Sequence, residues 1–476
     1  MEYEIVIGLE VHAQLLTNTK LFCSCTTPFG DPSNTHGCPV CLGLPGALPV
    51  LNRAAVEMAV LTGLALGCKV NEKSIFARKN YFYPDLPKGY QISQYDMPVC
   101  EHGTLPVTVD GQERVIGVTR VHMEEDAGKL IHDQDVDSLF DVNRCGTPLI
   151  EIVSEPDMRS SAEAYAYLTG LKQILEYLGI CDCNMEEGSL RCDANISLRP
   201  KGEKKLGTKT EIKNMNSFRN LEKALDYEAR RQEEVLSSGG TILQQTFLWD
   251  PGNNRSVPMR SKEDAHDYRY FPDPDLMPLV VESEWVEKLK EKLPELPVER
   301  RERFAQEYSL VPNAVEVLTS SRQVADYFEE TVAACKDPKA ASNWIMTDIM
   351  RILKDKKLES PRDLKVTPKR LGGLLGLINS GDVSAKAAKK VLDIMESEDK
   401  DPRVVIDEQG LGQVSDSGAI EAIVKQVIDA NPDAVEKYKG GDKKVTSFFM
   451  GQVMKATRGA ANPKEVNSIL SKLLAS

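Results

Sequence analysis

An alternation of apolar and polar residues near the N-terminus constrains the fold more than any other feature of this sequence. In Glu4–Leu15, "EIVIGLEVHAQL", one set of alternate positions is entirely apolar: Ile5, Ile7, Leu9, Val11, Ala13 and Leu15. Because successive side chains of a strand point to opposite faces, the pattern predicts a strand with one buried and one polar face. Glu10 and His12 then lie about 7 Å apart on the polar face. They are either an ordinary solvated face or two groups of a functional site, and this segment alone leaves both open.

The 476 residues exceed what one hydrophobic core supports, so several domains are expected. Strand patterns and Gly-Pro turns fill residues 1–293, which predicts an α+β domain. The charged, proline-punctuated stretch "KLPELPVERRERF" marks its end, and helical patterns dominate beyond it. A second break near "ESEDKDPRVVIDEQG" separates a helical domain at 294–405 from a small helical tail domain at 406–476.

The charge of the chain is unevenly distributed. The net charge is -13, which argues against a protein that coats nucleic acid indiscriminately. Between Lys437 and Ser476, however, eight basic and two acidic residues give a local charge of +6, so the remainder carries -19. An acidic body with a basic tail predicts a local contact with a polyanion.

The sequence predicts a cytoplasmic protein without a membrane segment. The N-terminus has no basic region and no signal-peptide cleavage pattern. The longest apolar stretch, "AAVEMAVLTGLALG", is short and contains Glu57, so we expect a core helix there. Eleven cysteines, an odd number, indicate reduced thiols.

Four of these cysteines have the spacing of a metal site. "CSCTTPFGDPSNTHGCPVC" contains a C-x-C and a C-x2-C pair, formed by Cys23, Cys25, Cys38 and Cys41. Four thiolates complete the tetrahedral shell of Zn²⁺, which predicts a structural zinc site with no open position for catalysis. Four free thiols or a redox pair are the alternatives.

Acidic residues interrupt several strand patterns of the first 293 residues. Glu151 lies in "TPLIEIVSEPD", which is apolar on both faces, and Asp193 lies in the alternating "GSLRCDANISLR". Glu125 shares the face of Val115, Gly117, Thr119, Val121 and Met123. Clustered carboxylates repel one another unless a divalent ion lies among them, and such oxygen-rich sites suit Mg²⁺. We expect Glu10, His12, Glu125, Glu151 and Asp193 to share one ion, although each acid could instead pair with a separate Arg or Lys.

Two aromatic loops are candidates for a polar passage or a substrate pocket. "RKNYFYPDLPKGYQISQY" supplies Lys79, Tyr81 and Lys88, and "DAHDYRYFPDPDL" supplies His266 and Asp275. Proline and glycine stiffen the first loop. The same pattern also fits well-anchored surface loops.

Several motifs together resemble the B subunit of the heterotrimeric glutamyl/aspartyl-tRNA amidotransferase family. They are "GLEVHAQL", "CSC…GCPVC", "KNYFYPDLPKGYQISQ", "HMEEDAGK", "NRCGTPLIEIVSEPD", "GSLRCDANISLR", "EIKNMNSF" and "HDYRYFPDPDL", and the stretch "VTSFFMGQVMKATRGAANP" resembles the tail of that family. The resemblance implies a body (cradle) domain with a mixed β-sheet similar to that of glutamine synthetase. The sequence contains no P-loop and no glycine- and serine-rich amidase segment.

The resemblance also implies a reaction, cofactors and partners. ATP would phosphorylate the side-chain carboxylate of Glu-tRNA(Gln) or Asp-tRNA(Asn), and ammonia would displace the phosphate, with Mg²⁺ at the five residues given above. Ammonia would come from an amidase-type A subunit through a passage lined by the loop residues given above, and a small C subunit would join the complex. The tail would bind tRNA phosphates through Lys443, Lys444, Lys455 and Arg458.

Two other functions remain open at this point. A zinc-dependent hydrolase would need an open coordination position, which four cysteines do not leave. A non-catalytic tRNA-binding scaffold would not depend on acids such as Asp193 for turnover.

Overall fold

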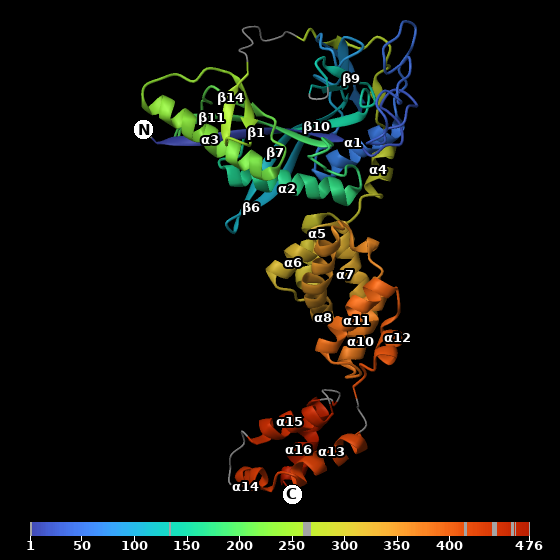
Figure 1. Cartoon of the computed structure of the whole chain (residues 1–476). Helices are drawn as coiled ribbons and strands as arrows, with labels where there is room; N and C mark the ends of the chain where they lie inside the picture. Colours follow the sequence, from blue (N-terminus) through green and yellow to red (C-terminus); the bar gives the residue numbers. More distant parts are fainter. Residues whose placement is uncertain are drawn as a thin grey trace. The chain divides into compact units, whose positions relative to one another are not determined.

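The computed structural model describes residues 2–132, 135–259, 268–413, 417–439, 445–457, 461 and 463–475. The chain divides into two compact units, Met1–Pro297 and Val298–Ser476. The first contains the sheets, and the second is helical (Figure 1). The expected α+β body followed by a helical region is therefore confirmed.

A nine-stranded mixed sheet forms the centre of the first unit. All neighbouring strands are antiparallel except β12 and β13, which are parallel. In spatial order the strands are β14 (Arg255–Pro258), β13 (Thr246–Asp250), β12 (Thr210–Lys213), β11 (Leu190–Pro200), β1 (Tyr3–Gln14), β10 (Pro148–Ser154), β7 (Gln112–Glu125), β6 (Cys100–Val109) and β2 (Lys69–Val70).

The predicted first strand is β1, and it occupies the middle of this sheet. Its residues Leu9, Val11 and Ala13 are fully buried, whereas Glu10 and His12 are only partly buried. The alternation thus separates a core face from a polar face, as the sequence predicts.

Helices cover the core face. They are α1 (Arg53–Ala65), α2 (Ser161–Leu178) and α3 (Phe218–Ser237), and Figure 1 shows α2 and α3 side by side along the sheet. Ser160 caps α2 by accepting a hydrogen bond from the backbone N–H of Glu163, and Gly179 ends it in the left-handed conformation. Asn52 caps α1 in the same way.

A β-bulge changes which residues of β7 face the core. Val153 of β10 pairs with Arg120, but the next residue, Ser154, pairs with Val118, so Thr119 is extra. As a result Val121 is fully buried, whereas Val115 is 59% exposed. The expected continuous face from Val115 to Glu125 is therefore wrong, because the extra residue shifts the alternation by one position.

Three small sheets bring the aromatic loops together. β4 (Ala77–Asn80) pairs with β5 (Tyr90–Ser93) and with β15 (Phe271–Pro272), which places the loop after residue 80 beside the segment that contains Asp275. β3 (Lys73–Ser74) pairs with β16 (Leu279–Val280), and β8 (Lys129–Ile131) pairs with β9 (Leu139–Asp141). Helix α4 (Ser283–Lys290) follows.

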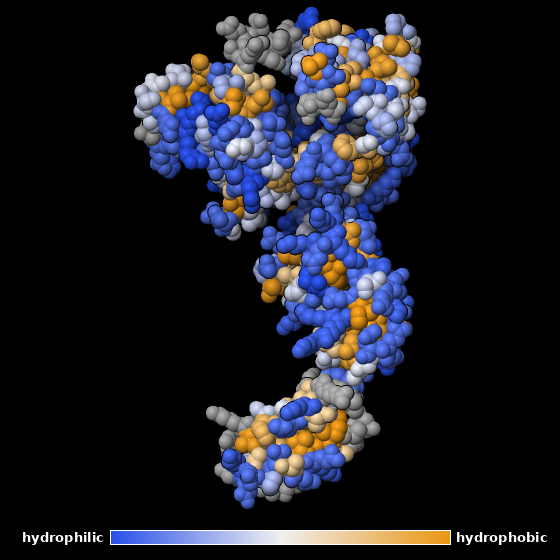
Figure 2. Space-filling model, viewed as in Figure 1, coloured by the Kyte–Doolittle hydropathy of each residue, from blue (hydrophilic) through white to orange (hydrophobic). Residues whose placement is uncertain are grey.

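The helical region contains two hydrophobic cores. The first is built from α5 (Pro297–Glu307), α6 (Pro312–Leu318), α7 (Arg322–Cys335), α8 (Pro338–Trp344), a π-helical turn (Ile345–Ile349), α9 (Met350–Lys356), a 3₁₀ turn (Pro361–Asp363), α10 (Pro368–Asn379), α11 (Ala385–Glu398) and α12 (Pro402–Gln409). The second is built from α13 (Ser417–Asp429), α14 (Pro432–Lys439), α15 (Val445–Ala456) and α16 (Pro463–Ala475). Figure 2 shows hydrophobic surface on this last group of helices. Phe448 of α15 is 43% exposed.

The predicted boundary between the middle domain and the tail domain, between residues 405 and 406, falls inside α12. The side chains of both residues pack in the first of these cores. The division into a middle domain and a tail domain at this point stays a prediction. Within the described residues, no helix combines the length and the apolar character needed to cross a membrane.

The bulge in β7 can be tested with two substitutions of the same type. We expect Val121→Ala to lower the free energy of unfolding of the first unit by about 2 kcal/mol, because it leaves a cavity in the core. Val115→Ala should lower it by less than about 0.5 kcal/mol, because this side chain is largely exposed. Urea denaturation followed by tryptophan fluorescence measures both, and equal losses would contradict the shifted register.

Candidate functional site

Four adjacent strands place four polar residues in one row on the polar face of the large sheet. His12 of β1 is paired with Arg191 of β11 on one side and with Glu151 of β10 on the other. Glu151 is in turn paired with His122 of β7. Residues directly opposite one another in antiparallel strands point to the same face, so these side chains meet.

Three residues of this row, His12, Glu151 and His122, contact one another or Glu124, the next residue but one after His122 on β7. The Nε2 atom of His12 lies 3.3 Å from Oε2 of Glu151 and 3.5 Å from Oε1 of Glu124. The Nε2 atom of His122 lies 3.3 Å from the same Glu151 oxygen and 3.9 Å from Oε2 of Glu124. His12, Glu124 and Glu151 each offer a ligand atom within 4.8 Å of the others, so these three residues could hold a metal ion. One imidazole and two carboxylates suit a divalent cation.

The charges in this group depend on one another. Burial disfavours the charged form of both His12 and Glu151, but the opposite charges around them outweigh it. Glu151 and Glu124 raise the pKa of His12 above its ordinary value, and His122 and His12 lower the pKa of Glu151 well below its ordinary value. A proton on His12 competes with a metal ion for the same nitrogen. Ion affinity should therefore rise as the pH rises through the pKa of His12.

Glu10 and Asp193 lie on the same face, opposite each other in the pairing of β1 with β11. Glu10 accepts a hydrogen bond of 2.9 Å from Asn195, and Asp193 forms a 2.6 Å ion pair with Lys213. Lys213 also contacts Glu211 at 2.8 Å. These two acids thus neighbour the histidine–glutamate group, but each contacts a different partner.

Glu125 does not join the group on the polar face. It follows Glu124 directly, so its side chain points to the opposite face, where Lys88 and the backbone N–H of Ile92 both donate hydrogen bonds to Oε1. Sequence reasoning expected Glu125 at the ion and missed Glu124 and His122. The alternation in "VHMEEDAGK" contained the signal, since His122 and Glu124 share the face opposite Val121 and Met123.

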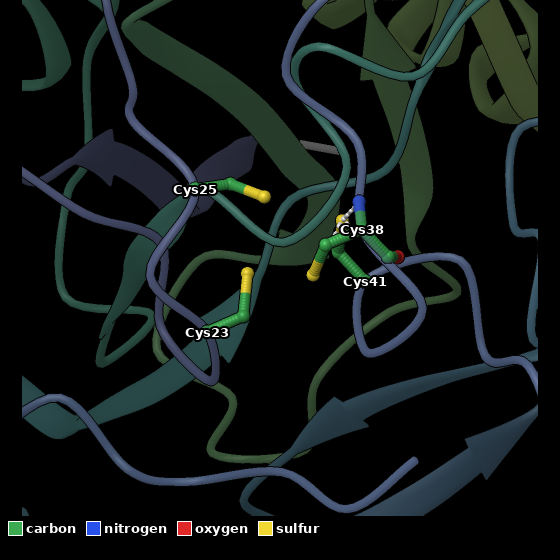
Figure 3. Close-up of side chains that lie close together, drawn as sticks. All are labelled: Cys23, Cys25, Cys38 and Cys41. Atoms are coloured by element: carbon green, nitrogen blue, oxygen red, sulfur yellow. Dashed lines mark hydrogen bonds between the residues drawn. The ribbon is translucent and has the colours of Figure 1, made fainter.

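The four predicted cysteines converge from two segments of one loop (Figure 3). Their sulfur atoms all lie within 4.8 Å of one another. A hydrogen bond from Cys23 is the main cause that lowers the pKa of Cys41 to about 4, and the backbone N–H of Cys38 and the charge of Lys20 act in the same direction. Burial raises the pKa of Cys25 to about 11. Four sulfurs at these separations fit a tetrahedral metal site.

The aromatic loops contribute to two places. Lys88 and Asp275 line a cavity of about 200 Å³, together with Glu125. Lys79 instead lies over the rings of Tyr81 and Tyr268, with Nζ 5.8 Å and 4.9 Å from their centroids. Lys79 and Tyr81 are not among the residues that line this cavity, so their place in a passage stays a prediction.

Part of the predicted set lies outside the described residues. His266, Lys443, Lys444 and Arg458 belong to the undescribed segments. Lys455 lies in the last turn of α15. The expected tRNA contacts of the tail therefore stay a prediction.

Comparison with known proteins places this arrangement in a family. Residues 5–287 match the family described as "GatB/GatE catalytic domain", and residues 326–474 match the one described as "GatB domain". The chain is 55% identical to the B subunit of the aspartyl/glutamyl-tRNA(Asn/Gln) amidotransferase of Syntrophotalea carbinolica, with 99% of this chain and 98% of the relative covered. It is 56% identical to the protein of the same name from Chlorobium phaeobacteroides, over the full length of both chains. The chain therefore belongs to the family of aspartyl/glutamyl-tRNA(Asn/Gln) amidotransferase B subunits.

Proposed function

We propose that this protein amidates Glu-tRNA(Gln), Asp-tRNA(Asn) or both, in an ATP-dependent reaction on the polar face of its large sheet. The observation that carries the proposal is the group of His12, Glu124 and Glu151, which lies opposite the helix-covered core face. The side chain of His12 is 20% exposed, so one edge of the group reaches the surface of the sheet.

The chemistry requires an activated carboxylate. A free carboxylate is a poor electrophile, so a phosphoryl group from ATP is first transferred to one of its oxygens. Ammonia then attacks the carbonyl carbon, forms the new C–N bond and loses a proton, and phosphate leaves with the electron pair of the C–O bond to the phosphorylated oxygen. Bound Mg²⁺ would supply positive charge between the crowded phosphate and carboxylate oxygens.

The residues around the ion group support this role. Two neighbours hold the carboxylates in place. His122 contacts Glu151, and the hydroxyl of Ser93 donates a hydrogen bond of 3.3 Å to Oε2 of Glu124. Arg191 and Lys213 lie on the same face and bring positive charge near any bound phosphate. We assign ion binding to His12, Glu124 and Glu151, and we keep Glu10 and Asp193 as further acids that a second ion or a bridging water could use.

The remaining features fit one component of a larger enzyme. The four-cysteine site suits a structural zinc ion, which argues against a zinc hydrolase because no coordination position is left for water. Ammonia from an amidase-type A subunit would reach the site along the cavity lined by Lys88 and Asp275, and a small C subunit would complete a heterotrimer. The similarity of the body domain to the glutamine synthetase fold, and the cytoplasmic location, stay predictions.

A non-catalytic tRNA-binding scaffold is the alternative. The buried carboxylate of Glu124 and the largely buried carboxylate of Glu151 are costly to maintain beside two histidines, and tRNA binding alone does not require them. This cost favours the catalytic function.

A single-turnover assay with misacylated tRNA, ATP and the partner subunits separates the two functions. We expect His12→Ala to slow amide formation at least about a hundredfold, because it removes an ion ligand, while tRNA affinity is unchanged. His102→Ala is the matched control, since that side chain is 74% exposed on β6. Wild-type rates in His12→Ala would support the scaffold.

The choice between Glu124 and Glu125 can be tested by ion binding alone. Glu124→Gln should weaken Mn²⁺ binding about 10- to 100-fold, because a neutral amide replaces a charged ligand. Glu125→Gln, a neighbour on the opposite face, should leave Mn²⁺ affinity unchanged. Electron paramagnetic resonance of titrated Mn²⁺ gives both dissociation constants, and the reverse order would restore the assignment drawn from the sequence.

The basic tail gives a separate prediction. We expect truncation after Gln413 to raise the apparent KM for misacylated tRNA far more than it lowers the saturated rate, because it removes the basic segment Lys437–Ser476, whose local charge is +6. The slope of log affinity against log salt should also become shallower. Equal affinities and slopes of the full and truncated complexes would mean that the tail does not contact tRNA.

A further inference from the structure

The loop that carries the four cysteines also forms a wall of the Lys88 cavity. Cys23, Cys41 and Gly43 line this cavity together with Lys88 and Glu125. The candidate metal site and the candidate ammonia passage therefore share one segment of chain. Figure 3 shows that the C-x2-C part of this loop folds back tightly behind the sulfur atoms.

Gly43 brings the cysteine loop into direct contact with Lys88. It follows Cys41 in a turn in which its N–H donates to the carbonyl of Val40, and its φ is 66°, which favours glycine. A Cβ atom at Gly43 would lie 2.3 Å from Cγ of Lys88 and 3.1 Å from its Cα. The backbone of the turn therefore packs closely against Lys88, in a position where any larger residue would push it away.

Lys20, which also lines the cavity, connects the two cysteine pairs of the loop. Its side chain is fully buried, and Nζ donates to the carbonyl of His36 at 2.6 Å and lies 3.8 Å from the sulfur of Cys41. Its backbone N–H donates to the carbonyl of Cys25. Lys20 thus bonds to both cysteine pairs and brings a buried positive charge to a site of four thiolates.

A second backbone contact extends this connection to Glu125. The N–H of Leu21, which follows Lys20, donates to the carbonyl of Gly146. The Cβ position of Gly146 lies 3.5 Å from Cβ of Cys41 and 3.7 Å from Oε2 of Glu125. Gly146 therefore lies between the cysteine loop and Glu125, the partner of Lys88 in the ion pair.

We propose that the four-cysteine loop, once closed by its metal ion, fixes Lys88 against Glu125 and so sets the shape of the cavity, with Gly43 as the positioning residue. The proposal rests on the metal site and the ammonia passage proposed above. It gives the metal ion, which has no open coordination position, a role in the reaction through the geometry of the passage.

Chemical labelling tests the position of Lys88 without measuring activity. Lys88 has a side chain only 9% exposed, whereas that of Lys69 is 70% exposed and serves as the internal reference. In the complete complex, we expect acetic anhydride to modify Lys88 about tenfold faster after the metal is removed by a chelator, with Lys69 unchanged. Mass spectrometry of the peptides gives both rates. An unchanged Lys88 rate after complete metal removal would overturn the proposal.

Two glycine variants distinguish the effect of losing the Gly43–Lys88 contact from the effect of straining the loop backbone. Gly43→Ala should raise the Lys88 labelling rate about tenfold while the metal is retained. Gly30→Ala is the matched control, because Gly30 also has a positive φ, 86°, but nothing lies within 4 Å of its Cβ position. Equal Lys88 rates in the two variants would contradict the role of Gly43. The chelation experiment on the unchanged chain gives the answer if Gly43→Ala does not fold.

A comparison of amide donors then tests the link to the passage. We expect Gly43→Ala to slow glutamine-dependent amidation about tenfold and to leave the rate with ammonium chloride within about twofold. If labelling shows that Lys88 moves but both donors react as in the wild type, the positioning role holds and the cavity is not the ammonia passage. If the wild type amidates misacylated tRNA with neither donor, the proposed function fails, while the labelling result still decides the role of the loop.

Discussion

The antiparallel register of β1 against β10 and β11 is the constraint on which both the core and the candidate site depend. It places Val11 and Ala13 beneath the helices and His12 in a row with Glu151 and Arg191. A slip of one residue would move His12 into the apolar core and would expose the aliphatic side chains. Burial of the core face therefore holds the polar side chains in register, so the stability of the sheet also orients the site.

Opposite charges compensate one another across the polar face. Asp126 lies 2.9 Å from Arg191 and accepts a hydrogen bond from Gln14, while Asp193 pairs with Lys213. The contact of Glu124 and Glu151 with two histidines is different, because an imidazole carries its charge only when protonated. This is the place on the face where a divalent ion can replace a proton as the compensating charge.

Two consecutive residues of β7 connect the two candidate sites. Glu124 points to the polar face, where it contacts His12, and Glu125 points to the opposite face, where it contacts Lys88. Because successive side chains of a strand point to opposite faces, one segment of backbone positions a group of the ion site and a group of the cavity. A displacement of Glu125 in the cavity wall would therefore also displace Glu124, one of the candidate ion ligands.

Local patterns in the sequence determined much of this structure. The alternation in Glu4–Leu15 predicted the central strand and its polar face, because a strand exposes alternate residues whatever its partners are. The Ser160 cap and the stop at Gly179 predicted the ends of α2 for an equally local reason, since backbone groups at helix ends need partners from adjacent residues. The spacing of the cysteines predicted their convergence, and the motifs identified the family.

Only the tertiary structure decided which acids meet. Glu124 rather than Glu125 contacts His12, and the bulge at Thr119 depends on how β10 pairs with β7. The approach of Lys20 to Cys41 and of Lys88 to Gly43 likewise joins segments whose spacing in the sequence carries no signal. These contacts follow from strand register and loop packing between distant segments, which the free energy of the whole fold selects and no local pattern specifies.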